Sequence, residues 1–258
     1  MLNLIGDILN WTAAGIVFPV LFLPLAILVT RRGQPLLTWL ALVIAIVVAG
    51  GAFAHLTPVL SITPSITKTS MFGGALLLAT LVIALSGGAE KVAATLTFLF
   101  DQVTRSIGRT VMWLLLVMAL VQFGIVVLRY VFGINFIFMQ ESITYMHGAV
   151  FLLAGGYALL TDDHVRVDIF YRDATPRRKA LIDLAGTYLL LFPICLLLLW
   201  TASPYVANSW SVGEGSNESS GIKGLFILKS FIPAFAMLLA MAGFVIASRA
   251  SAILREPR

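Results

Sequence analysis

Residues 110–132 read TVMWLLLVMALVQFGIVVLRYVF, and Arg129 is the one charged side chain in this run. A helix needs about 20 predominantly apolar residues to cross a hydrocarbon core. Further apolar runs of similar length lie at residues 11–30, 36–54, 70–88, 140–161, 180–206 and 225–248. Since hydrocarbon offers backbone N–H and C=O groups no partner, each run must be helical. The sequence therefore predicts an all-α, polytopic membrane protein with about seven transmembrane helices.

Composition agrees with this fold class and excludes a soluble enzyme. Hydrophobic residues make up 60% of the 258 residues and charged residues only 11%, whereas soluble domains carry roughly 25% charged residues. The net charge of +5 could indicate nucleic acid, but the basic residues are scattered at the ends of apolar runs. Membrane lipids are therefore the expected partner of these charges, and no nucleic acid is expected. The single cysteine, Cys195, lies inside an apolar run and is interpreted as a packing residue.

The distribution of Lys and Arg predicts the orientation of the chain. With seven spans, Lys68, Arg129, Lys223 and Lys229 fall on one side of the membrane, and the other 13 of the 17 basic residues fall on the opposite side. Cytoplasmic loops carry the excess of basic residues in membrane proteins. The pattern places the N-terminus in the periplasm or outside and the C-terminus in the cytoplasm.

The first and last parts of the chain differ in polar content. The first three runs contain almost no ionisable residue, whereas the last four hold nearly all the polar side chains. This predicts a three-helix N-terminal extension at residues 1–89 and a four-helix unit at residues 90–258. Residues 90–109 place apolar side chains on one helical stripe and charged ones opposite, which is typical of an amphipathic helix in the membrane interface. The alternative is a cytoplasmic extension of the helix at 110–132.

Few ionisable or polar side chains lie near the predicted spans, and those that do are candidates for function. Arg129 ends one span and Glu141 begins the next, so a tight turn brings both to one membrane level. We expect the two to interact directly or through water; the alternative is that both side chains reach outward separately. Gln122 and His147 fall at comparable depth on the same hairpin and could form a hydrogen bond across it.

Two polar loops complete the candidate regions. The segment 162–168 contains His164, Arg166 and Asp168; the i, i+4 spacing of His164 and Asp168 could suit a metal, but the arginine among the acids favours a charged network. The segment 208–224 is rich in Gly and Ser and is predicted to be mobile unless a partner orders it.

Motifs for catalysis or cofactor binding are not found. The chain has no Walker loop, no Gly-rich dinucleotide turn, no nucleophile elbow and no HExxH. The residues therefore predict no cofactor, no metal and no enzymatic activity. Paired, interrupted short helices that would form a substrate site at midplane are not found either.

An ordered set of motifs resembles a known family. LRYVFG at 128–133 closes one span, and QESITYMHGAVFLLAGGYALLTDDHVRVDIFY at 140–171 opens with Glu141 at the start of the next and ends in HVRVDIFY. Over about residues 95–250 the chain resembles the small permease subunit of TRAP transporters, the DctQ-like family. The helices before this region depart from the minimal pattern of that family.

The resemblance implies a scaffold subunit of a bacterial inner membrane uptake system driven by an ion gradient, usually of sodium. Its implied partners are a large permease, which holds the substrate and sodium sites, and a periplasmic binding protein, which delivers an organic anion, usually a carboxylate. Arg129, Glu141, His164, Arg166 and Asp168 match the recurring motif of the family, which implies structural or assembly roles. The alternative function is a stand-alone channel or carrier, or a non-catalytic subunit of a membrane enzyme.

Overall fold

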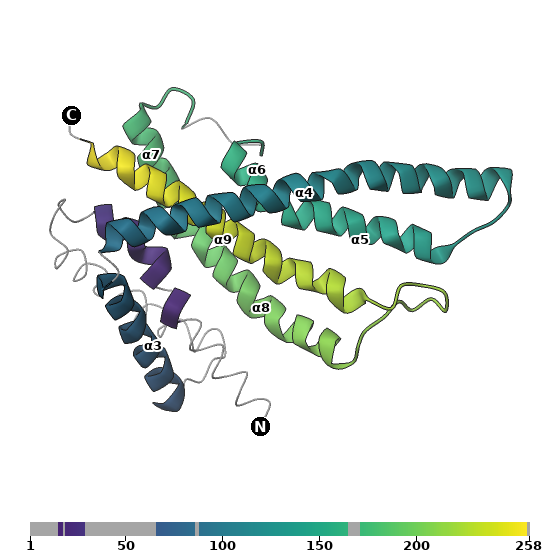
Figure 1. Ribbon diagram of the computed structural model, residues 1–258, viewed down its shortest axis with the longest axis horizontal. Coiled ribbons are helices and arrows are strands. Elements are labelled where there is room, and N and C mark those ends of the chain that lie inside the picture. Colours follow the sequence, from purple (N-terminus) through teal and green to yellow (C-terminus); the bar gives the residue numbers. More distant parts are fainter. Residues whose placement is uncertain (1–14, 18, 29–65, 86–87, 165–170, 257–258) are drawn as a thin grey trace. The chain divides into compact units, whose positions relative to one another are not determined.

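The protein is described from a computed structural model, which places residues 15–17, 19–28, 66–85, 88–164 and 171–256. All regular secondary structure in these residues is helical, as the sequence predicts (Figure 1). The helices are α3 (Ile66–Leu85), α4 (Ala89–Val131), α5 (Ile137–Leu153), α6 (Gly155–Thr161), α7 (Pro176–Gly186), the π-helical turn η2 (Thr187–Leu191), α8 (Phe192–Ser211) and α9 (Leu225–Arg255).

The chain forms two compact units. One consists of Phe98–Ile246, and the other of Met1–Thr97 with Ala247–Arg258. Helices α4 and α9 each contribute to both units, because their residues cross the divisions. The domain boundary near residue 89 was predicted from the distribution of polar side chains along the sequence, and it stays a prediction.

Four helical stretches of the described residues are long and apolar enough to cross a membrane. They are Ala89–Val131, Ile137–Thr161, Pro176–Ser211 and Leu225–Arg255. The four runs predicted as spans in the second part of the chain are thus confirmed as helices that could cross a membrane. Residues 15–17 and 19–28 are helical, and α3 covers most of the predicted run 70–88. The predicted run 36–54 lies outside the described residues, so the total of seven spans stays a prediction.

Helix α4 is continuous over 43 residues. At 1.5 Å per residue it is about 65 Å long, roughly twice the thickness of a hydrocarbon core. Residues 90–109, predicted as a separate amphipathic helix, instead form its first half, because no proline interrupts the chain between 90 and 131. This is the extension named above as the alternative, and a place in the membrane interface stays a prediction.

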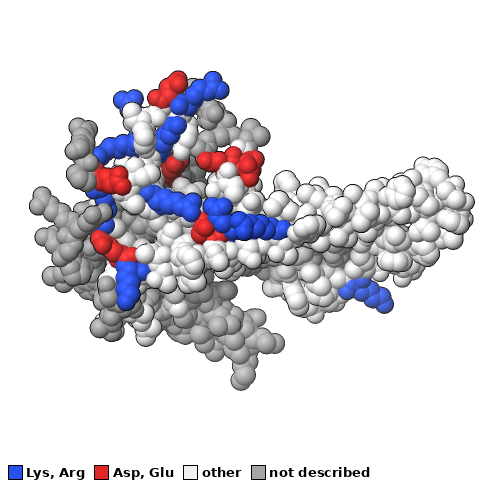
Figure 2. Space-filling model, turned by 45° about the horizontal axis from the view of Figure 1, so that its top comes forward, with Lys and Arg blue, Asp and Glu red and all other residues white. Residues whose placement is uncertain are grey.

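Charge is distributed unevenly along α4. Its first half carries the ion pair between Arg105 Nε and Asp101 Oδ2, 2.8 Å apart and one helical turn from each other. Its second half has a single charged residue, Arg129. In the view of Figure 2, most charged side chains are gathered on the left. The stretch of α4 and α5 that reaches to the right is almost entirely uncharged. An uncharged surface of this kind suits hydrocarbon and not water.

The third membrane-capable stretch runs through α7, η2 and α8 without a break. Thr175 caps α7, where its Oγ1 accepts from the Arg178 N–H at 3.4 Å, and Pro176 occupies the first turn, where its missing N–H costs nothing. The π-helical turn directly precedes Pro193. Since a proline ring crowds the carbonyl one turn earlier, the wider π turn gives it room while the helix continues.

Small residues let the helices of unit Phe98–Ile246 approach closely. A Cβ added at Gly156 of α6 would lie 2.8 Å from the carbonyl oxygen of Leu238 in α9, and one added at Gly243 of α9 would overlap Leu191 in η2. Phe244, which is fully buried, packs edge-to-face on Phe100 of α4 with ring centroids 5.3 Å apart. Contact between backbones through glycine is a common means of helix association in membranes.

Candidate functional site

The loop 212–224, which joins α8 to α9, is folded by its own hydrogen bonds. The Ser216 N–H donates to the Ile222 carbonyl at 3.0 Å, and the Gly221 N–H donates to the Glu218 carbonyl at 3.1 Å. Gly213 has a positive φ of 58° at the start of the loop, a conformation that favours glycine. The backbone groups of this segment thus find partners within the chain, and its mobility in the absence of a partner stays a prediction.

Glu141, near the start of α5, binds this loop at two points. One carboxylate oxygen accepts a hydrogen bond from the Ser216 hydroxyl, and the other accepts from the Ile222 N–H at 2.6 Å. Gly221 is enclosed between them, since a Cβ there would lie 2.7 Å from Glu141 Oε1. We call these contacts the Glu141 clasp. A carboxylate that accepts two donors from one loop fixes the position of that loop on α5.

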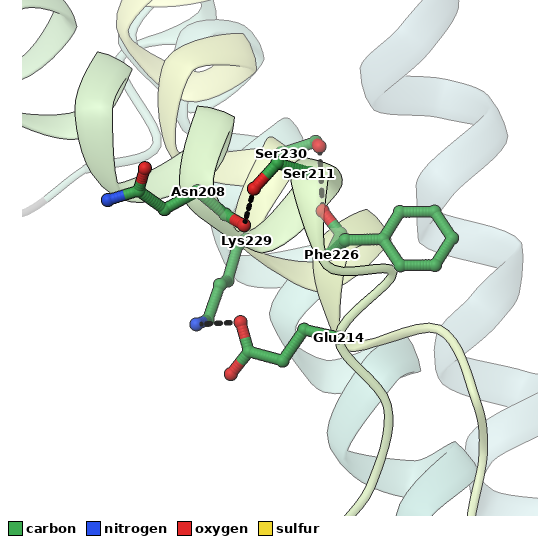
Figure 3. A network of polar contacts seen from close by, with 6 residues as sticks. All are labelled: Asn208, Ser211, Glu214, Phe226, Lys229 and Ser230. Atoms are coloured by element: carbon green, nitrogen blue, oxygen red, sulfur yellow. Dashed lines mark hydrogen bonds and ion pairs between the residues drawn. The ribbon is translucent and has the colours of Figure 1, made fainter.

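A second set of contacts joins the loop to α9. Lys229 Nζ lies 2.5 Å from Glu214 Oε2 (Figure 3). It also lies 4.1 Å from the centroid of the Tyr205 ring, so one ammonium group bridges the loop, α9 and α8. The hydrogen bond from Lys229 holds the pKa of the Glu214 carboxyl below its ordinary value. Glu214 therefore stays ionised at neutral pH and keeps this contact.

The end of α8 and the start of α9 are also linked by polar and aromatic contacts. Trp210 Nε1 donates to Ser230 Oγ at 2.8 Å, and Ser230 Oγ donates to the Phe226 carbonyl at 2.8 Å. The Trp210 and Phe226 rings meet at 62° with centroids 4.6 Å apart. Figure 3 shows the Ser230–Phe226 contact together with that of Ser211 and the Asn208 carbonyl at the end of α8. These contacts and the clasp form one polar end of the unit Phe98–Ile246.

Arg129 and Glu141 do not form an ion pair in the structure. Arg129 lies 6.0 Å from the ring centroid of its neighbour Tyr130, and the carboxylate oxygens of Glu141 accept from the loop instead. The direct form of the predicted interaction is therefore replaced by the Glu141 clasp. A contact through water stays a prediction.

The predicted hydrogen bond between Gln122 and His147 does not occur among the described residues either. Both side chains are exposed. The His147 ring instead stacks on Phe151, four residues on, with centroids 6.3 Å apart and an interplanar angle of 16°. Equal depth on a hairpin therefore did not bring the two side chains together.

The segment that contains His164 is described only in part. His164 Nδ1 lies 3.4 Å from the Ala158 carbonyl at the end of α6, and Asp162 takes the left-handed conformation, with φ 60°, that ends this helix. Arg166 and Asp168 lie outside the described residues, so the charged network predicted for 162–168 stays a prediction. Within the described part of the chain, no group of three or more His, Cys, Asp or Glu side chains is arranged to hold a metal ion.

Sequence reasoning singled out Glu141 but missed its partners. Ser216 and Ile222 lie 75 and 81 positions further along the chain, so no local spacing connects them with α5. Glu214 was interpreted only as part of the loop 208–224, and Lys229 only as one of the basic residues that set the orientation. The one available signal was a pair of opposite charges flanking a short Gly- and Ser-rich loop, which would close that loop if they met.

A known protein family matches the second part of the chain. The family model "Tripartite ATP-independent periplasmic transporters, DctQ component" matches residues 118–255. This range covers just over half of the chain and includes the Glu141 clasp and the contacts of Lys229. No curated protein matches the chain, and no solved structure matches it.

Proposed function

Since the chain belongs to the DctQ component family of the tripartite ATP-independent periplasmic transporters, we propose that it is the small membrane subunit that holds such a transporter in place. Components of this family are parts of transporters and not enzymes. The four membrane-capable helices of the described residues support a multi-pass membrane protein. The family match is the observation that carries the proposal.

In this proposal a separate large permease of the DctM type carries the substrate and the coupling sodium ions, and the present chain is its fixed support. The cargo is an organic anion, most simply a carboxylate, delivered by a periplasmic binding protein. The packing of the chain favours this role. Helices α6 and α9 approach closely at Gly156, and polar contacts fix the loop 212–224. A frame of this kind keeps its shape while a partner moves.

The proposed orientation puts the loop 212–224 in the periplasm and the C-terminus in the cytoplasm of a bacterial inner membrane. The excess of basic residues on the opposite side of the predicted spans supports it. The clasped loop then offers a preformed surface to the binding protein. A preformed loop costs less conformational entropy on docking than a mobile one.

One face of α4 is the proposed contact with the large permease. Trp113, Leu120 and Phe123 follow one another at helical spacing and are 70%, 63% and 69% exposed in the isolated chain. Large aromatic side chains of this kind dominate the binding energy of many protein interfaces. In this proposal the rest of the exposed apolar surface contacts lipid.

Co-purification tests the proposal. The chain is co-expressed with a tagged large permease of the same transporter, and the amount retained on the tag is measured after washing in mild detergent. We expect retention of the unaltered chain, and an about tenfold loss when Trp113 and Phe123 are both changed to Ala. The matched control is Leu189→Ala, which removes an equally exposed side chain from η2 and should leave retention unchanged. No retention of the unaltered chain contradicts the proposed assembly, and equal loss in the control contradicts the assignment of this face.

A further inference from the structure

The last turns of α9 present a face of small side chains that is buried. Ala247, Ala250, Ser251 and Leu254 are spaced by three, four and seven residues, which places them on one side of the helix. Their exposed fractions are 0%, 3%, 2% and 8%. Ala252, on the opposite side, is exposed. Other parts of the chain therefore cover this face.

The N-terminal segment 19–28 contacts the face directly. Ser251 Oγ donates a hydrogen bond of 3.0 Å to the Pro24 carbonyl, a buried contact between residues 227 positions apart. Leu23 and Pro24 are fully buried, and Ala26 is 2% exposed. The bond gives the buried hydroxyl an acceptor outside its own helix and so favours one position of the segment on α9.

Further contacts tie the same unit together. Arg255 Nη1 lies 2.8 Å from Glu90 Oε1, which joins the end of α9 to the first turn of α4. Gly15 lies against α3, where an added Cβ would be 2.6 Å from the Phe72 carbonyl oxygen. Pro24 and Glu90, which precede the family match at 118–255, thus contact residues near the end of that match.

We propose that residues 19–28 form a permanent intramolecular brace, which covers the Ala247, Ala250, Ser251 and Leu254 face of α9 and keeps it from lipid and from other subunits. The brace adds to the proposed scaffold role without depending on it. Because the covering segment belongs to the same chain, its effective concentration at α9 is high and no partner is needed to recruit it. The apolar side chains around Leu23 supply the packing that holds the brace, and the Ser251 hydrogen bond adds to it.

Thiol labelling of the full chain in mild detergent tests the brace. Ser251→Cys places a thiol under the brace, and Ala252→Cys places one on the exposed side of the same turn. A buried thiol reacts with a maleimide only when its surroundings open. We expect the cysteine at 251 to react at least about tenfold more slowly than the one at 252. The native Cys195, 1% exposed in the other unit, reports global unfolding in every sample by peptide mass spectrometry.

The brace is then opened by Leu23→Asn, with Ile16→Asn as the matched control at an exposed position of the same extension. We expect Leu23→Asn to bring labelling at 251 close to the rate at 252 while Cys195 stays unreacted, and Ile16→Asn to change neither. Leu23→Ala is the milder second variant and should accelerate labelling at 251 in the same selective way. Fast labelling at 251 in the unperturbed chain, or acceleration only together with Cys195 in both Leu23 variants, overturns the proposal.

Discussion

Gly156→Ala is the most direct test of the close packing of α6 against α9. The added Cβ would lie 2.8 Å from the Leu238 carbonyl oxygen and 3.1 Å from Thr104 Cγ2. The closer neighbour is backbone, which has no rotamer to yield, so α6 and α9 must move apart. Overpacking of this kind costs about 1–3 kcal/mol, a loss of roughly 5- to 150-fold in the folded-to-unfolded ratio.

The matched control is Gly186→Ala at the end of α7. A Cβ there meets nothing within 4 Å, and alanine favours a helix over glycine by about 0.5–1 kcal/mol. The two variants make the same chemical change and should alter the free energy of unfolding in opposite directions. Gly148→Ala should fall between them, because the neighbour it meets at 2.7 Å is the end of the flexible Leu228 side chain.

The assay is equilibrium unfolding of the purified chain in mild detergent by added sodium dodecyl sulfate, followed by tryptophan fluorescence. Gly156→Ala should unfold at a lower fraction of the denaturing detergent than the unaltered chain, and Gly186→Ala at an equal or higher one. If Gly156→Ala is as stable as Gly186→Ala, the close approach of α6 to the α9 backbone is not a feature of the folded protein, and the argument from it fails.

Three further predictions concern the polar end. Glu141→Ala removes both acceptors of the clasp, so the amides of the loop 212–224 should exchange with deuterium faster. The control is Glu218→Gln, at an exposed position of the same loop, which should leave this exchange unchanged. Equal acceleration in both variants would contradict the clasp. The pKa of Glu214 is lowered in the folded chain. The stabilisation that its carboxylate gives the folded loop is therefore complete above the ordinary glutamate pKa, and it is lost as the pH falls through the lowered pKa. The deuterium exchange rate of the loop amides, corrected for the intrinsic pH dependence of amide exchange, should therefore rise on acidification of the unaltered chain. It should rise less in Glu214→Gln. A double-mutant cycle of Arg129→Ala and Glu141→Ala on co-purification with the large permease should show coupling if water joins these side chains, and strict additivity would remove that idea.

The spans of the second part of the chain could be predicted from sequence because each depends on local composition alone. A run such as 110–132 has too few charges for water and enough length for a bilayer. The arrangement of residues 90–109 could not be predicted in the same way. An apolar stripe with charges opposite looks alike in a separate surface helix and in the first half of a long one, and only continuity of the backbone distinguishes them.

The contacts of the candidate site depended on information that local sequence does not carry. Arg129 and Glu141 share a membrane level, but a backbone N–H and a hydroxyl from a distant loop occupy the carboxylate. The same holds for Ser251, whose acceptor Pro24 lies 227 positions away. Pairings of this kind depend on how the helices pack. The positions of polar residues in the sequence limit the possible packings but do not determine which one forms.

The central claim is that this chain supports a transporter and that solute passes through another polypeptide. Proteoliposomes that hold the purified chain alone, the large permease alone, or both are compared for sodium-driven uptake of a labelled carboxylate in the presence of the periplasmic binding protein. The account predicts uptake only when both membrane subunits are present. Accumulation of the solute against its gradient by the present chain alone would contradict it and would favour a stand-alone carrier.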